Sequence, residues 1–177
     1  MMGMAMLAIG LGSFAPSLLD HKDRKGPVTL ALAFHGVIFA AWLFLFFLQS
    51  LLVSVNRTKL HRRLGWSGVA LAIIMAFSGF DAILRMARRG YDLSGDLVHR
   101  PGDLERVLVF QWGDLAVFVL LTGLAVVFRR RPLVHRQLML CATAGGALPA
   151  ACDHLIGHTP WLREIPWPLS LVPITVL

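Results

Sequence analysis

Charged side chains are scarce in this sequence. Asp, Glu, Lys and Arg make up only 15% of its 177 residues, whereas 56% are hydrophobic. A water-soluble domain of this size needs more polar residues than that to cover its outer surface. The apolar residues also run in long uninterrupted blocks, which an amphipathic soluble helix does not show. The scarcity of charge therefore excludes an ordinary soluble domain and predicts that lipid surrounds most of the chain.

Acidic residues are fewer than basic ones, 10 against 17, which gives a net charge of +7. An excess of this size raises the question of nucleic acid. The Lys and Arg residues, however, stand in short clusters between the apolar blocks, where lipid headgroups would lie. We therefore expect the lipid bilayer as the partner of these clusters, and no nucleic acid.

Cysteine and the motifs of soluble enzymes are scarce too. The two cysteines, Cys141 and Cys152, lie in one apolar block, about 16 Å apart if that block is a helix, which is too far for a disulfide. We interpret both as small packing residues. Neither a nucleotide-binding loop nor a serine-hydrolase elbow occurs.

The apolar blocks predict an all-α fold, a polytopic transmembrane helix bundle with five spans and a partial sixth. The spans are expected at about 1–19, 28–55, 64–84, 107–128 and 133–156, with the partial one at 166–177. Gly145, Gly146 and Pro149 predict a kink in the fifth span. We expect the natural chain to continue beyond Leu177.

Basic residues predict the orientation. The loops at 56–63 and 129–136 each hold four Lys or Arg and no acid, so both should be cytoplasmic, which also puts the N-terminus inside. The loops at 20–27, 85–106 and 157–165 would then lie outside. Tryptophans near the expected span ends suit an aromatic belt at both membrane surfaces: Trp66, Trp112, Trp161 and Trp167.

A short internal repeat accompanies these loops. Arg57-x-x-x-His61-Arg62-x-Leu64 is echoed by Arg131-x-x-x-His135-Arg136-x-Leu138, and upstream Phe34-His35 is loosely echoed by Phe110-Gln111, with spacings that differ by two residues. The repeat predicts two helix hairpins of the same sense, related by an axis normal to the membrane. His61 and His135 would both lie at the cytoplasmic edge, where contact with headgroups is the simplest interpretation.

Ionisable residues inside the expected spans are candidate functional residues, because burying each in lipid costs about 2.5–3.5 kcal/mol. Given the orientation above, all of them fall toward the outer leaflet. They are His35, Asp81, Asp114, Asp153 and His154, with Gln49 and Gln111 as neutral companions. On the second span, His35, Trp42, Gln49 and Asn56 recur every seven residues, so this stripe should face protein.

The first functional hypothesis is a haem-binding or redox-associated membrane subunit. His35 and His154 share the outer level and His61 and His135 the inner one, which would make two stacked bis-imidazole sites for haem b. With the pair His35-Gly36, this arrangement resembles the cytochrome b561 and ferric-reductase type of membrane cytochrome. The chain departs from that type in having Gln111, and no His, on the fourth helix.

The second hypothesis is a metal-dependent membrane hydrolase with Zn²⁺ held by His35, Asp81, His154 and His158. The order of a His, an Asp and an HxxxH pair resembles the membrane-embedded ceramidase and adiponectin-receptor group. That group has a serine four residues before its first His, where this chain has Ala31. A competing interpretation pairs Asp81 with Arg85, its neighbour one helical turn away.

Two further hypotheses stay open. A proton-coupled transporter or accessory subunit would use Asp114, Gln111 and Asp153 as a proton or ion site, and a non-catalytic scaffold would need no site. The segments LHRRLGW and HRQLML resemble those of a group of uncharacterised bacterial polytopic membrane proteins. That resemblance implies a bacterial inner membrane but no activity. A homo-oligomer or a membrane redox partner also stays open.

Overall fold

The computed structural model describes residues 2–19, 29–89 and 103–149, and all the regular structure in these ranges is helical. The helices in chain order are α1 (Met2–Leu19), α2 (Leu30–Ser54), α3 (Thr58–Arg89), α4 (Asp103–Val127) and α5 (Pro132–Ala142), which continues as the π-helical segment η2 (Thr143–Ala147). The all-helical prediction is confirmed for these residues. The end of the predicted fifth span and the partial sixth lie outside them.

Within the described ranges, three helices are long and apolar enough to cross a membrane, over Ala33–Ser54, Thr58–Arg88 and Leu108–Val127. Helix α1 contributes a shorter apolar stretch, Gly3–Gly12. Many large apolar side chains on these helices point outward and are exposed, among them Phe34, Phe44, Ile73, Phe77, Val109 and Leu120. Water would solvate such a surface poorly, so the three long helices have the outer faces of membrane helices.

Two predicted loops are partly wrong. The stretch 56–63 was expected to be a loop, but α3 already begins at Thr58, and at its other end it continues to Arg89. Helix α4 likewise begins earlier than predicted, at Asp103. A helix satisfies its own backbone hydrogen bonds, and long basic side chains can reach the headgroups from a helical backbone. Charge therefore marks where a membrane surface lies, and it does not mark where a helix ends.

The turn between α2 and α3 is a Schellman motif. Asn56 has a φ of 59°, in the left-handed region that Asn tolerates better than most residues. The N–H of Arg57 donates to the carbonyl of Leu52 at 2.8 Å, and that of Asn56 to Val53 at 3.1 Å. These two bonds satisfy carbonyls left open at the end of α2 and turn the chain directly into α3.

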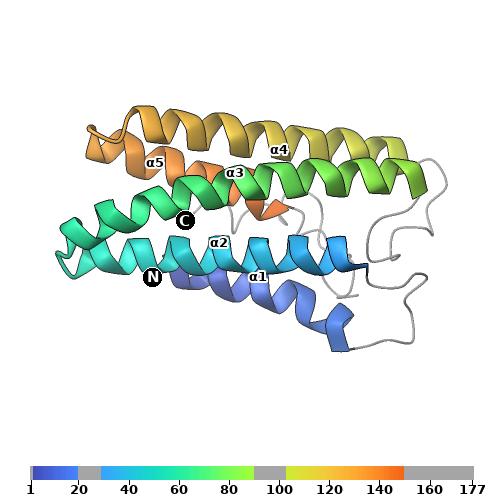
Figure 1. Ribbon diagram of the computed structural model, residues 1–177, viewed down its shortest axis with the longest axis horizontal. Coiled ribbons are helices and arrows are strands. Elements are labelled where there is room, and N and C mark those ends of the chain that lie inside the picture. The colour runs from blue at the N-terminus through green and yellow to red at the C-terminus, as the bar shows by residue number, and fades with distance from the viewer. Residues whose placement is uncertain (1, 20–28, 90–102, 150–177) are drawn as a thin grey trace, which may run out of the picture.

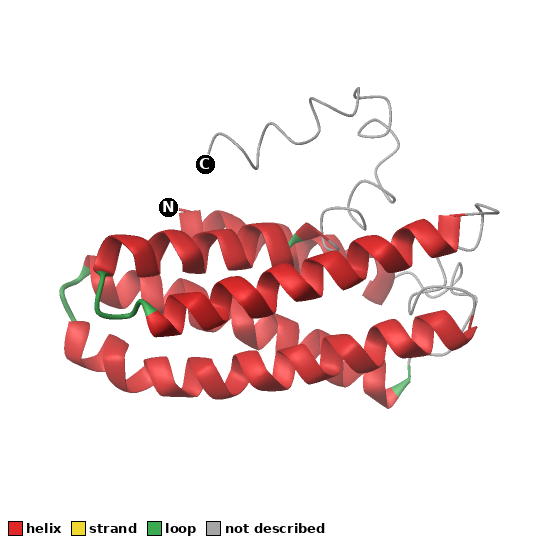
Figure 2. Cartoon of the chain, turned by 90° about the horizontal axis from the view of Figure 1, so that it is seen from above, coloured by secondary structure: helices red, strands yellow, loops and turns green. Residues whose placement is uncertain are grey.

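Helices α2 and α3 form one antiparallel hairpin, and α4 and α5 form another (Figure 1). Both hairpin turns lie at the same end of the bundle, as Figures 1 and 2 show. Helix α3 packs against α4, α1 lies along α2, and η2 packs against α4. The first residues of α1 lie near the end of α2, because Gly3 is beside Phe47 and Ser50.

The core lies where the helices meet at mid-length. Trp42 and Phe118 stack edge to face there, with ring centroids 5.0 Å apart. Gly146 in η2 lets that segment approach α4 closely, because a Cβ at this position would lie 2.6 Å from the backbone nitrogen of Phe118. The predicted irregularity around Gly146 and Pro149 takes the form of a π-helix. The N–H of Leu148 donates to Thr143 five residues back, at 3.0 Å.

Corresponding positions of the sequence repeat have corresponding local structure. The N–H of His61 donates to the carbonyl of Arg57 at 3.1 Å, and that of His135 to Arg131 at 2.9 Å. Both histidines thus stand in the first turn of the second helix of their hairpin. Trp42 and Phe118, which have the same spacing as Phe34 and Phe110, contact each other across the core. Contacts between equivalent residues are what an axis running between the two hairpins predicts.

Candidate functional site

The structure brings His61 and His135 together at the basic end of the bundle. Their ring centroids are 6.3 Å apart and the ring planes stand at 77° to each other. His61 comes from the first turn of α3 and His135 from the first turn of α5, so each hairpin supplies one imidazole. Both residues are half-buried.

The Nδ1 atom of each imidazole has its own hydrogen-bond partner. Nδ1 of His135 lies 2.8 Å from the carbonyl oxygen of Ala125, a fully buried residue of α4. A carbonyl can only accept, so Nδ1 carries a proton, and in the neutral imidazole Nε2 then has the lone pair. The side-chain amide of Gln49 lies against His61. With its nitrogen facing the ring it donates to Nδ1, while its oxygen accepts from the N–H of Gly65 at 3.1 Å.

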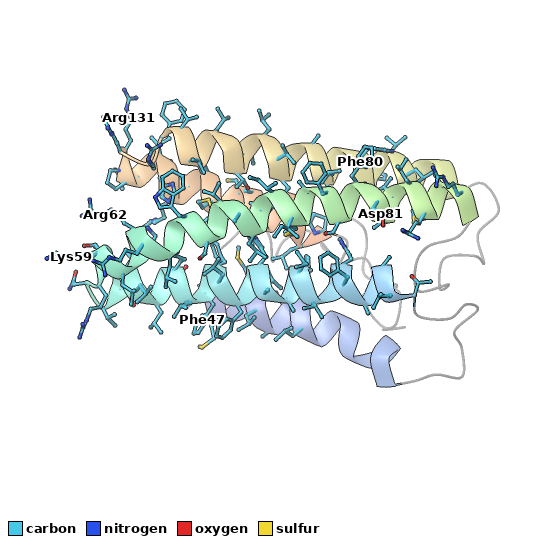
Figure 3. The ribbon with its side chains drawn as sticks, viewed as in Figure 1. Phe47, Lys59, Arg62, Phe80, Asp81 and Arg131 are labelled. Atoms are coloured by element: carbon cyan, nitrogen blue, oxygen red, sulfur yellow. The ribbon has the colours of Figure 1, made fainter. Side chains whose placement is uncertain are left out.

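Basic side chains lie at the same end of the bundle as this histidine pair. Lys59, Arg62 and Arg131 lie at this end of the bundle, and Asp81 lies toward the other (Figure 3). The sequence has no Asp or Glu in 24–80 or in 115–152, the stretches that supply this end. Arg85 and Asp81, in the other half of α3, form an ion pair. The excess of positive charge at this end of the bundle therefore favours anionic ligands.

His35 lies in the other half of the bundle, on α2, where it bonds to α3. Its Nδ1 is 3.2 Å from Oγ of Ser78. The Ser78 hydroxyl donates to the carbonyl of Met75 at 3.0 Å, so its oxygen accepts from the imidazole. His35 thus tethers α2 to α3. Its expected companion His154 lies outside the described residues, as do Asp153 and His158.

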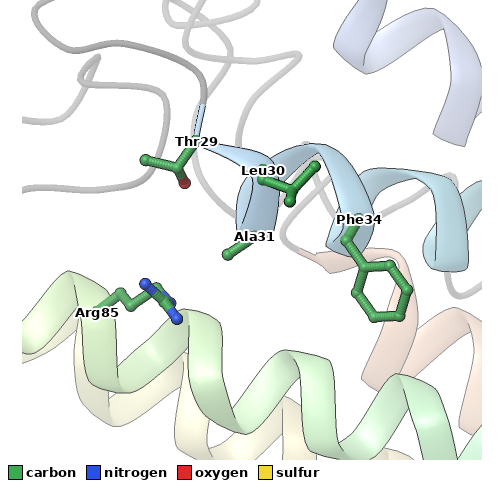
Figure 4. Close-up of a pocket in the computed structure, with 5 residues that line it drawn as sticks. All are labelled: Thr29, Leu30, Ala31, Phe34 and Arg85. Carbon is green, nitrogen blue, oxygen red and sulfur yellow. The ribbon is translucent and has the colours of Figure 1, made fainter.

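Asp81 is bound to Arg85, whose Nε donates to its Oδ2 at 2.6 Å. The competing interpretation, an ion pair within α3, is thereby confirmed, and a zinc-binding role for Asp81 stays a prediction. Arg85 also lines a hollow of about 580 Å³ with Thr29, Leu30, Ala31 and Phe34 from the start of α2 (Figure 4). Within the described residues, no group of three or more His, Cys, Asp or Glu side chains could hold a metal ion.

Gln111 and Asp114 are half-buried on the first half of α4, in the same half of the bundle as His35. Their role as a proton or ion site stays a prediction. Three deeply buried polar atoms have no hydrogen-bond partner in the part of the chain that the structure describes: Nε1 of Trp42 and the hydroxyls of Thr122 and Thr143. The protein-facing stripe predicted on α2 is confirmed for Trp42, which is buried, and for His35, which bonds to α3. It is wrong for Asn56, which is exposed in the turn after α2.

Sequence reasoning gave no role to three residues that hold the histidines. Gln49 and Ser78 each belong to a less apolar stripe of their helix, whereas Ala125 gives no signal in the sequence. A polar residue seven positions after Trp42 hinted at an inward-facing Gln49. A backbone carbonyl, by contrast, can come from any residue type, so the sequence could not identify Ala125 as the partner of His135.

No protein-family model matches this chain, and no curated protein or solved structure is significantly similar to it.

Proposed function

We propose that this protein is a b-type haem-binding, redox-associated membrane subunit in which His61 and His135 would hold the haem iron. The separation of the two imidazoles supports the proposal. A metal lies about 2 Å from an imidazole nitrogen, so two axial imidazoles have ring centroids about 6 Å apart. The rings of His61 and His135 are 6.3 Å apart. When bound, the haem would supply one-electron transfer.

The Nδ1 atom of His135 supports the same proposal. A metal-bound histidine commonly donates its other N–H to a backbone carbonyl or a polar side chain, which fixes the ring and its tautomer. The bond from His135 to Ala125 is of this kind. Gln49 bonds to His61 in the opposite sense, because its amide nitrogen donates to Nδ1 and so leaves the ring proton on Nε2. Nε2 of His61 could hold iron only if this amide turned by about 180°, which would break its bond with the N–H of Gly65. His135 thus has a neighbour suited to orienting it as a ligand, and His61 would need this turn.

The proposal also includes a membrane location and an orientation in that membrane. The chain would be a multi-pass protein of a bacterial inner membrane, with five spans and a partial sixth and with the basic end in the cytoplasm. The N-terminus would be cytoplasmic too, which is supported by the position of Gly3 beside Ser50 near the end of α2. A membrane redox partner, or a second copy of the chain, would exchange electrons with it.

Absorption spectroscopy of the purified full chain, expressed with an ample haem supply, tests the proposal. We expect a Soret band in the wild type that His61→Ala and His135→Ala each abolish. The control is His35→Ala, which should keep the band because His35 bonds to Ser78 in the other half of the bundle. A colourless wild type contradicts haem binding. A band that only His35→Ala removes contradicts the assignment to His61 and His135.

A further inference from the structure

A shallow hollow of about 370 Å³ lies on the first turns of α3, and neither His61 nor His135 lines it. It is lined by Lys59, Arg62, Arg63 and Trp66. Residues three, four and seven positions apart share one face of a helix, so the four side chains form one continuous surface. All four are exposed, Trp66 to 67%.

This hollow combines three positive charges with an amphipathic ring. As no acid occurs in the stretch 24–80, no nearby residue of the first hairpin neutralises the three cations. Such a group favours a ligand that carries anionic oxygens, because phosphate oxygens accept strong hydrogen bonds from Arg and Lys. Tryptophan is enriched at the depth of the lipid headgroups.

The face continues from the hollow into apolar side chains. Ile73 and Phe77 stand seven and eleven positions after Trp66, on the same side of the helix, and are 54% and 73% exposed. Along one stripe of α3 the order is therefore cations, then tryptophan, then aliphatic and aromatic side chains. A phospholipid has the same order, from its phosphate through the glycerol region to the acyl chain.

We propose that this stripe binds one anionic phospholipid, with the phosphate held by Lys59, Arg62 and Arg63 and an acyl chain lying along Ile73 and Phe77. A soluble phosphate would use the cations and leave the apolar half of the stripe uncovered. The inference rests on the membrane placement proposed above and does not require haem. The presence or absence of a Soret band therefore leaves it unaffected.

Native mass spectrometry of the detergent-solubilised full chain, titrated with dioleoyl phosphatidylglycerol or dioleoyl phosphatidylcholine, tests the site. Each cation near an anionic lipid contributes about fivefold to binding. We therefore expect Arg62→Gln/Arg63→Gln to weaken binding of the first phosphatidylglycerol by roughly 25-fold. The control, Arg129→Gln/Arg130→Gln, removes the same charge from the same end of the bundle and should change the affinity much less. Trp66→Ala should weaken both lipids.

Three outcomes would overturn the site. Equal affinity for the two lipids means that the charge is not recognised. Equal losses in the two double variants mean diffuse attraction to the whole basic end. Displacement of the lipid by low millimolar inorganic phosphate means that the phosphate group alone is bound and the apolar half of the stripe is not used.

Discussion

Adding one methyl group to Gly146 should destabilise the bundle, whereas adding it to Gly145 should not. A Cβ on Gly146 would lie 2.6 Å from the backbone nitrogen and 2.7 Å from the Cα of Phe118. These are main-chain atoms of α4, so the two helical segments must move apart to relieve the clash. At Gly145 the nearest atom to an added Cβ is Cγ1 of Val117 at 3.9 Å, an ordinary contact.

The expected size of the effect follows from two opposing contributions. Overpacking a well-filled core costs about 1–3 kcal/mol, and a main-chain clash falls at the upper end of that range. Replacing a helical glycine by alanine returns about 0.5–1 kcal/mol. Gly146→Ala should therefore lose about 2 kcal/mol of unfolding free energy, which corresponds to a Tm lower by roughly 4–8 °C for a chain of this length. Gly145→Ala should keep or slightly raise the Tm.

Thermal unfolding of the detergent-solubilised protein, followed by intrinsic tryptophan fluorescence, measures both variants against the wild type. Both substitutions gain the same helix propensity, so their difference isolates the contact with Phe118. Equal melting temperatures for the two variants would refute the close approach of η2 to α4.

Three smaller predictions concern other contacts. Asn56→Ala should lower the unfolding free energy by about 1 kcal/mol because alanine tolerates a positive φ poorly, whereas Asn56→Gly should not lower it; equal effects in thermal unfolding would exclude the left-handed turn. Ser78→Ala and His35→Leu should show a coupling of about 0.6 kcal/mol in a double-mutant cycle, and additive effects would mean that they do not bond. Thr143→Val should keep or raise the Tm because the buried hydroxyl has no partner among the described residues; a marked loss would reveal one.

Hydrophobic run length predicted the helices well because lipid imposes both a minimum length and an apolar surface on any span. It predicted their ends poorly. The clusters around Arg62 and Arg88 were interpreted as loops, although α3 continues through both. The length of a hydrophobic run shows where the chain is apolar. A helix can continue beyond that run into charged residues, because it needs only satisfied backbone hydrogen bonds. The irregularity of the fifth helix was predictable because Gly146 and Pro149 each disfavour a regular α-helix.

The histidine pair was only half predictable. The repeat placed His61 and His135 at the same level, but no spacing in the sequence says that two helices of different hairpins bring their first turns together. The partners Gln49 and Ala125 depend on that packing and were found only in the structure. For His35 the sequence predicted a partner, His154, that lies outside the described residues. Among the described residues, His35 forms its hydrogen bond with Ser78.

The basic end of the bundle and the half that holds His35 differ in how well the sequence repeat matches. At the basic end both copies of the repeat have a histidine, whereas in the other half one copy has His35 and the other has Gln111. Where two equivalent hairpins meet, a residue near the axis lies close to its own counterpart, so one position of the repeat supplies two side chains to a single place. Trp42 with Phe118, and His61 with His135, have this relation. At the level of His35 the counterpart is Gln111, so the repeat supplies one imidazole and not two. A site that needs a matched pair of imidazoles from the repeat is therefore expected at the basic end, and the half of the bundle that holds His35 is free to carry asymmetric contacts.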